Sequence, residues 1–232
     1  MKEKVHQMTK VALVYTSTTP ELVELVEREV RAVLGDVELL SYQDPSILAD
    51  VRDSGYVTAR PAARLIGMYL EAVQDGAQAI LNICSSVGEV ADSVQDMAEY
   101  LGVPIVRIDQ EMCFEAARSG MRIGVLATLP TTLDPTMHTI ARAARTINRH
   151  PVLVEGLIDG AFGLDQVEFR RVMLAKAEEL RDTVDVLVLA QGSMAYCEEY
   201  IQEKTGIPTL SSPRFGAKAL ACALDELGVR GE

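Results

Sequence analysis

One order of predicted elements occurs twice along the 232-residue chain, and this repeat limits the fold more than any other feature. The first half opens with the apolar run "VALVYTS" (11–17) and later has "QAILNIC" (78–84). The second half begins again with "RIGVLAT" (122–128) and later has "VDVLVLAQGS" (184–193). Helical patterns separate these runs, and "YLGVPI" in the first half matches "KTGIPT" in the second. Alternating strands and helices indicate parallel sheets with right-handed crossovers.

Local signals support this reading of the elements. In "TPELVELVEREVRAVLG", apolar residues recur at helical spacing, Thr19 and Pro20 suit the helix start, and Gly35 suits its end. The run 78–84 shows little alternation of apolar and polar residues, as expected for a strand that is covered on both faces.

We therefore predict an α/β protein made of two similar Rossmann-like lobes that are related by a pseudo-twofold axis. Each lobe has a mostly parallel sheet of about four strands. The first lobe spans residues 1–115, and a C-terminal helix, 213–232, returns to it; the second spans 116–212. Ligands bind beyond the carboxyl ends of parallel strands, so we expect an active site in the cleft between the lobes.

Charge and hydropathy exclude several classes of partner. The net charge is −12, and no basic footprint for nucleic acid is visible. No apolar segment reaches the roughly 18 residues of a membrane span, and "MKEKVHQMTK" lacks the apolar run of a signal peptide. We expect a protein that binds neither nucleic acid nor membrane.

The cysteines and histidines indicate reduced thiols and no metal. Four cysteines in a chain of this length do not form a disulfide framework, so we expect free thiols and a cytoplasmic location. The three histidines, His6, His138 and His150, are scattered and have no zinc-type spacing with a cysteine. We expect no metal site.

Hydroxyl residues gather where the predicted strands end. The four clusters are Thr16, Ser17 and Thr18; Cys84, Ser85 and Ser86; Thr128, Thr131 and Thr132; and Gln191, Gly192 and Ser193. Any one of these residues is explained as well by a helix N-cap. Four clusters at equivalent positions favour a shared site for a carboxylate or phosphate, held by hydroxyls and backbone N–H groups.

Cys84 stands at a strand end and directly before a predicted helix. A helix N-terminus favours the thiolate, so we expect the pKa of this thiol to be lowered and the sulfur to act as a base or nucleophile. The alternative is a buried cysteine that only packs in the core.

Three motifs resemble the aspartate/glutamate racemase superfamily, which also holds hydantoin racemases, maleate isomerases and arylmalonate decarboxylases. "IGVLATLPTT" (123–132) is similar to the motif that opens the second lobe, and "NICSSVGE" (82–89) to the first catalytic-cysteine motif, with Ser85 and Ser86 in place of Asn and Thr. "DVLVLAQGSM" (185–194) is similar to a strand that elsewhere ends in Gly-Cys-Thr. The resemblance implies a cofactor-independent enzyme that holds a substrate carboxylate between two lobes.

The chain departs from that pattern at the second catalytic cysteine, because Gln191 falls at its place in the repeat. Glutamine does not exchange a proton near neutral pH. Cys197, Cys113 and Cys222 lie in helical patterns, and we interpret them as structural. Three alternatives remain: Ser193 or a water acts opposite Cys84, the reaction is one-sided, as in decarboxylation, or the protein binds a ligand without turnover.

The preferred hypothesis is a racemase or isomerase that acts at the carbon next to a carboxylate or carbonyl of a small acid or amino-acid-like substrate. Cys84 would be the acid/base, and Ser193 its catalytic partner. We expect no pyridoxal phosphate, nicotinamide or metal, since no Gly-x-Gly-x-x-Gly follows the first strand. The expected partners are a small carboxylate substrate and further copies of the chain in a homo-oligomer.

Overall fold

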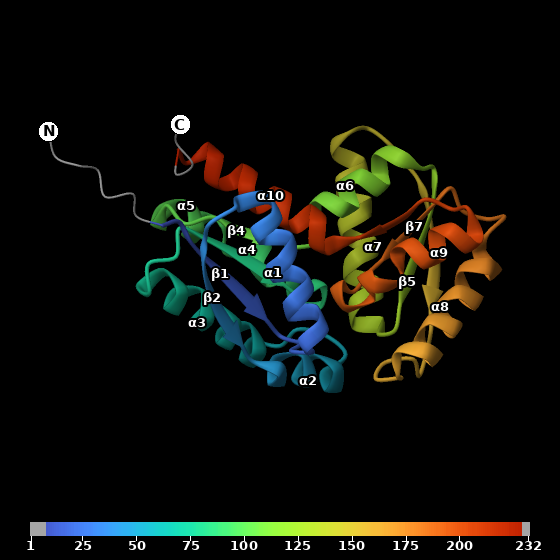
Figure 1. Ribbon diagram of the computed structural model, residues 1–232, viewed down its shortest axis with the longest axis horizontal. Helices are drawn as coiled ribbons and strands as arrows, with labels where there is room; N and C mark the ends of the chain where they lie inside the picture. The colour runs from blue at the N-terminus through green and yellow to red at the C-terminus, as the bar shows by residue number, and fades with distance from the viewer. Residues whose placement is uncertain (1–7, 229–232) are drawn as a thin grey trace, which may run out of the picture.

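A computed structural model describes residues 8–228, which form two α/β lobes side by side (Figure 1). His6 and most of the N-terminal segment "MKEKVHQMTK", which was interpreted as no signal peptide, lie outside the described residues. The last four positions of the predicted helix 213–232 also lie outside them.

Each lobe is built on a four-stranded sheet in which every neighbouring pair of strands is parallel. The first sheet has the order β2 (Glu38–Gln43), β1 (Lys10–Tyr15), β3 (Ala79–Ile83) and β4 (Ile105–Arg107). The second has the order β6 (Val152–Leu157), β5 (Arg122–Ala127), β7 (Val186–Leu189) and β8 (Thr209–Ser211). The two orders correspond strand by strand, which confirms the predicted α/β architecture with two similar lobes.

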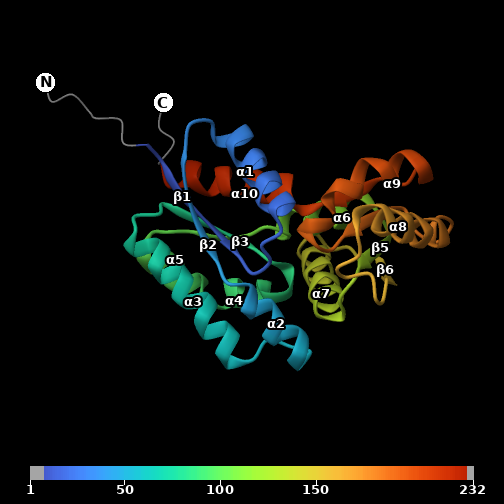
Figure 2. The ribbon, with the colours of Figure 1, turned by 60° about the horizontal axis from the view of Figure 1, so that its bottom comes forward.

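Helices cover both faces of the first sheet (Figure 2). On one face lie α1 (Pro20–Leu34) and α10 (Ser212–Glu226); on the other lie α2 (Pro45–Ser54), α3 (Ala59–Gln74), α4 (Gly88–Ser93) and α5 (Gln95–Leu101). Along β1, Val11 and Leu13 pack against the first group and Ala12 and Val14 against the second. Burial on both faces explains why the strand reads as one apolar run.

The second sheet is covered in the same way. Its faces carry α6 (Gln110–Ser119) and α7 (Pro130–Thr146) on one side and α8 (Gln166–Leu180) and α9 (Glu198–Thr205) on the other. Short 3₁₀ turns follow the two strands that matter most for the site: η1 (Ser85–Val87) after β3 and η2 (Gly192–Cys197) after β7.

Two parts of the helix prediction were wrong. The helix α2 was not expected, and the single helix expected after Cys84 is divided into η1, α4 and α5. Val94, which links α4 and α5, has ψ of 16° rather than a helical value.

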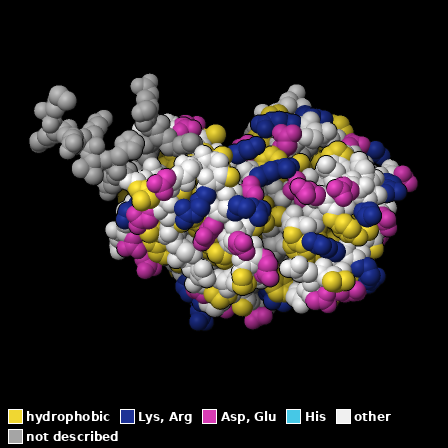
Figure 3. Space-filling view, in the orientation of Figure 1, with side chains coloured by type: hydrophobic (Ala, Val, Ile, Leu, Met, Phe, Trp, Pro, Cys, Tyr) yellow, Lys and Arg dark blue, Asp and Glu magenta, His cyan; other side chains and the backbone are white. Residues whose placement is uncertain are grey.

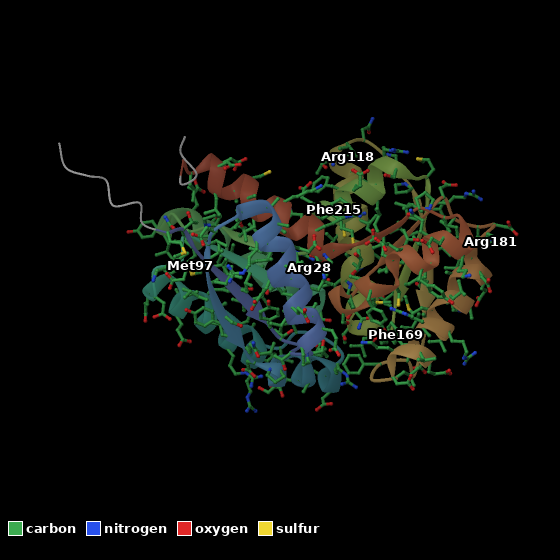
Figure 4. The ribbon with its side chains drawn as sticks, in the orientation of Figure 1. Arg28, Met97, Arg118, Phe169, Arg181 and Phe215 are labelled. Carbon is green, nitrogen blue, oxygen red and sulfur yellow. The ribbon has the colours of Figure 1, made fainter. Side chains whose placement is uncertain are left out.

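The last helix joins the two lobes. Near the start of α10, Phe215 packs against the core of the second sheet (Figure 4), whereas Leu220 and Leu224 lie in the core of the first. Between them, a Cβ added to Gly216 would stand 2.7 Å from Ile108 Cγ1 and 2.8 Å from Ile108 Cα. Only glycine allows this close approach between α10 and the segment that follows β4.

The predicted boundary between residues 115 and 116 falls inside α6. Met112 and Cys113, in the first turns of that helix, belong to the core of the second sheet. We propose that the second lobe begins before α6, so that this helix lies wholly within it.

On the face shown in Figure 3, acidic and basic side chains are interspersed. Within residues 8–228, no helix combines the length and apolar character needed to cross a membrane. The same residues contain no group of three or more His, Cys, Asp or Glu side chains placed to hold a metal ion.

Candidate active site between the two lobes

Strand ends from both lobes line one small cavity, of about 40 Å³. It brings together eight of the predicted site residues: Ser17, Cys84, Ser85, Ser86, Thr132, Gln191, Gly192 and Ser193. These residues follow β1, β3, β5 and β7, which are the two central strands of each sheet. The carboxyl ends of parallel strands therefore converge on the cavity from two sides.

Four predicted residues do not line the cavity. Thr16 is fully buried beneath it, and Thr18 lies half-buried in the β1–α1 connection. Thr128 is buried and contacts the cavity residue Gln191, whereas Thr131 is half-buried at the start of α7 with its hydroxyl enclosed. Thr16 and Thr128 thus support residues of the lining rather than the cavity itself.

The thiol of Cys84 is half-buried between the cavity and the core of the first lobe. Burial raises its pKa above the ordinary thiol value. The hydroxyls of Thr16 and Ser86 and the backbone N–H groups of Ser86 and Val87 favour the thiolate and lower the pKa, but burial outweighs them. The net lowering expected from the sequence was wrong, because the cost of burying the thiolate exceeds the stabilisation that these hydrogen bonds provide.

Gln191 lies just beyond the end of β7 and lines the same cavity as Cys84. Its Oε1 accepts hydrogen bonds from the backbone N–H and the hydroxyl of Thr128, at 2.8 and 2.9 Å. A backbone N–H is only a donor, so the amide atom facing it must be the oxygen. The Gln191 Nε2 group is therefore the part left to donate into the cavity.

A hydroxyl pair links the lobes at the cavity edge. Ser86 Oγ and Thr132 Oγ1 lie 2.7 Å apart, and both residues are buried. Next to this pair, the hydroxyls of Ser85 and Thr131 are enclosed without a hydrogen-bond partner. Buried hydroxyls are normally satisfied, so the Ser85 hydroxyl, which belongs to the cavity lining, indicates a position where a ligand oxygen would be accommodated.

The other three cysteines lie away from the cavity. Cys113 and Cys197 are fully buried in the two cores of the second lobe, and Cys222 is exposed on α10. Burial raises the pKa of Cys197 to about 11 and that of Cys113 well above the ordinary value. None of the three is among the residues that line the cavity.

The apolar part of the lining was not predicted from the sequence. It consists of Leu22, Leu48, Ile83, Leu129 and Phe162. Phe162 comes from the loop between β6 and α8, and the guanidinium of Arg52 on α2 stacks 4.3 Å from its ring centroid. Two signals in the sequence could have identified this apolar part of the lining. One is the segment "GAFGLD" after a strand, and the other is the helical spacing of Ile47, Leu48 and Val51.

An ionic network ties the lobes together behind the cavity. Arg107, which is 3% exposed, donates two hydrogen bonds to Asp109, at 3.0 and 2.9 Å, and one to Asp92 at 2.7 Å. It also reaches Thr139 on α7, and Asp92 binds Arg142 of the same helix at 2.8 Å. Contacts between β4, α4 and α7 therefore fix this side of the cleft.

A larger cavity, of about 440 Å³, lies between α1 of the first lobe and η2, α9 and the start of α10. It shares Leu22, Gly192 and Ser193 with the small cavity, and its charged residues are five glutamates and two arginines. It contains no thiol, so the chemistry suggested by the sequence belongs to the smaller cavity.

Comparisons with known proteins agree with this arrangement. The family model described as Asp/Glu/Hydantoin racemase matches residues 11–220. No curated protein matches the sequence significantly. Among solved structures, allantoin racemase from Klebsiella pneumoniae is similar, with a TM-score of 0.66, 19% identity, and coverage of 95% of this chain and 89% of that one.

Two further structures show the same fold. Glutamate racemase isoform RacE1 from Bacillus anthracis has a TM-score of 0.71 at 15% identity, over 97% of this chain and 84% of its own. Unliganded arylmalonate decarboxylase has a TM-score of 0.54 at 14% identity, over 97% of this chain and 94% of its own. Enzymes of different reactions therefore share this two-lobe architecture.

Proposed function

We propose that this chain, which belongs to the Asp/Glu/hydantoin racemase family, is an isomerase-type enzyme that moves a proton at the carbon next to a carboxylate or carbonyl of a small acid or amino-acid-like compound. Cys84 would act as the acid/base. The observation that carries the proposal is the position of this thiol: it lines the interlobe cavity at the end of β3 and faces the strand end of Gln191 and Ser193.

In the proposed reaction, the Cys84 thiolate removes the proton from Cα. The electron pair of the broken C–H bond moves onto the carboxylate or carbonyl oxygen. The hydroxyl of Ser85 and the Nε2 group of Gln191 would donate hydrogen bonds to that oxygen and stabilise the charge as it develops. The thiol then returns a proton to Cα. Burial, which raises the thiol pKa, makes the thiolate a stronger base for this step.

The opposite face of the substrate would meet Gln191 and Ser193. Since the amide does not exchange protons, inversion requires Ser193 or a water beside it to supply the second proton. We propose Ser193 for that role because its hydroxyl lines the same cavity.

A second candidate is a one-cysteine decarboxylase, which is favoured by the raised pKa of Cys84. A thiol that stays protonated near neutral pH is ready to donate. The C–C bond to a carboxylate would break and release CO₂, and the electron pair left on Cα would take the proton from Sγ. Water would then reprotonate the thiolate.

Either reaction needs only a thiol and hydrogen-bond donors, so we propose that no cofactor takes part. A catalytic thiol must stay reduced, which favours the cytoplasm. The expected homo-oligomer remains a prediction.

The test is solvent-deuterium exchange followed by NMR, across small carboxylic acids, amino acids and hydantoins. We expect Cα exchange with the wild type and Cys222→Ala, and none with Cys84→Ala. Exchange faster than inversion would indicate a single base, whereas equal rates would indicate a second base. Release of CO₂ would favour the decarboxylase. Exchange that is unchanged in Cys84→Ala would remove Cys84 from the mechanism.

A further inference from the structure

We propose that Asn82 and Tyr69 are positioning residues for the Cys84 thiol, because a buried chain of hydrogen bonds runs from the Tyr69 hydroxyl through the Asn82 amide to the Cys84 carbonyl. Neither residue is among the described residues that line the cavity, so each would act through Cys84 rather than on the substrate. The inference deepens the proposed function and rests on it for one point, that the thiol of Cys84 moves the proton.

Asn82 interrupts an otherwise apolar strand. β3 reads Ala-Ile-Leu-Asn-Ile, and Asn82 is its single polar residue, with 1% of its surface exposed. A buried amide without hydrogen bonds costs roughly 1–3 kcal/mol, so an asparagine at such a place must be matched by partners. The partners of Asn82 therefore indicate what the residue does.

The Cys84 carbonyl fixes the direction of each hydrogen bond in the chain. This oxygen is only an acceptor, so the Asn82 atom 3.2 Å from it must be Nδ2, which donates. Oδ1 then faces the Tyr69 hydroxyl, which donates at 2.9 Å. Burial and the charge of the nearby Cys84 thiolate raise the pKa of Tyr69, a fully buried residue of α3, so its hydroxyl stays protonated and keeps donating. The Asn82 amide is therefore held at both ends.

The carbonyl that Asn82 holds belongs to the peptide group that leads into η1. Cys84 is extended, with φ of −164° and ψ of 116°, and η1 starts at the next residue. The N–H groups of Ser86 and Val87 in this turn favour the Cys84 thiolate. A peptide group is planar, so rotation of the Cys84 carbonyl would turn the whole group that joins the strand to η1 and shift those donors relative to the sulfur. By fixing the carbonyl, Asn82 fixes the geometry on which the thiolate depends.

The second lobe shows that the fold does not require an amide at this position. Asn82 pairs with the fifth residue of β1, and Leu189 pairs with the fifth residue of β5. Two positions after them come Cys84 and Gln191. Leu189 is fully buried, so the equivalent strand accommodates an apolar side chain there. The asparagine therefore accompanies the thiol rather than the sheet.

Two variants test the chain of hydrogen bonds in the full-length protein. Asn82→Leu removes it with the side chain that the second lobe carries at the equivalent position, and Tyr69→Phe removes only the hydroxyl. Iodoacetamide labelling across a pH series gives the midpoint at which Cys84 ionises, whereas the accessibility of the sulfur sets the plateau. We expect the midpoint to rise by at least about half a pH unit in Asn82→Leu and by less in Tyr69→Phe, because the donors of η1 lose their alignment with the sulfur.

Kinetics separate a positioning role from a role in stability alone. In Cα deuterium exchange, we expect kcat to fall at least about tenfold in Asn82→Leu while KM changes less than about twofold, because the thiol moves and the substrate contacts remain. Thr209→Val is the control: its hydroxyl, in a residue that is 1% exposed, bonds the Ile207 carbonyl in the second lobe. It should lower the free energy of unfolding and leave the Cys84 midpoint and kcat unchanged.

The outcomes separate this inference from the proposed function. An unchanged midpoint and kcat in folded Asn82→Leu and Tyr69→Phe would overturn the inference, even if urea unfolding showed a loss of stability. An equal shift in Thr209→Val would overturn it too. If Asn82→Leu did not fold, Tyr69→Phe would decide alone. A shifted midpoint without any wild-type exchange would refute the proposed reaction and leave the positioning of Cys84 standing.

Discussion

Thr128 holds the side chain of Gln191 from two directions, with its backbone N–H 2.8 Å and its hydroxyl 2.9 Å from Oε1. The two hydrogen bonds fix the plane of the amide and turn its nitrogen away from Thr128. A residue that replaces an acid/base group is here built into the cavity as an oriented donor. In the proposed mechanism, the face of the substrate opposite Cys84 would meet this amide donor together with the Ser193 hydroxyl.

Installing a thiol at this place should supply a better acid/base group than the Ser193 hydroxyl proposed for this face. We expect Gln191→Cys to raise the rate of inversion relative to exchange by at least about tenfold, because a thiol exchanges protons near neutral pH far more readily than a hydroxyl. NMR exchange and chiral chromatography measure the two rates. Gln191→Ala, which removes the amide without adding a thiol, is the control and should not gain inversion. An inversion-to-exchange ratio in Gln191→Cys no higher than in Gln191→Ala would contradict the two-face model.

Removing one of the two donors should loosen the amide. In Thr128→Val the backbone N–H remains and the hydroxyl is lost, so we expect about 1 kcal/mol less stabilisation of the transition state, roughly a fivefold lower exchange rate. Thr183→Val is a matched control, since its hydroxyl bonds the Leu180 carbonyl at the end of α8. Equal losses in both variants would show a general effect on the fold.

The pH dependence of Cys84 follows from its raised pKa. Only the thiolate is alkylated, so we expect the rate at Cys84 to rise about tenfold per pH unit and to level off above the ordinary thiol range. Thr16→Val and Ser86→Ala each remove a hydroxyl that favours the thiolate, so the pKa rises further and alkylation at a given pH slows. Iodoacetamide labelling read by mass spectrometry gives these rates. Ser93→Ala, whose hydroxyl bonds Val90, should leave them unchanged.

In the ionic network around Arg107, removing a buried arginine should cost far more folding stability than removing an exposed one. Arg107→Ala leaves Asp109, which is 1% exposed, without its partner, and we expect a loss of about 3–5 kcal/mol in the free energy of unfolding. Arg142→Ala removes a pair whose arginine side chain is 47% exposed, and its cost should stay within about 1 kcal/mol. Urea unfolding measures both. Similar losses would mean that the buried arginine contributes no more than a surface pair.

The sheets could be predicted because their signals are local and repeated. Strands buried on both faces read as unbroken apolar runs, as in "QAILNIC", and the second half repeats the order of the first. Cys84 and Gln191 could then be assigned to the candidate site because ligands bind beyond the carboxyl ends of parallel strands, here β3 and β7.

What could not be predicted depends on packing between distant segments. The wall of the cavity combines Leu48 of α2 with Phe162 of a loop more than a hundred positions later, and no spacing pattern joins them. The direction of the Cys84 pKa shift was also out of reach. It depends on how deeply the thiol is enclosed by other segments, which has no local signal.

Because α10 packs against both lobes, the order of synthesis has a consequence for folding. Ala217, Leu220 and Leu224 fill the core beside β1 and β3, yet they are the last apolar residues of that core to leave the ribosome. The first lobe emerges early with one face of its sheet covered by α1 alone, whereas all strands of the second sheet have been synthesised by Ser211. Synthesis and completion therefore run in opposite orders: the half of the chain that is made first is the half that finishes folding last.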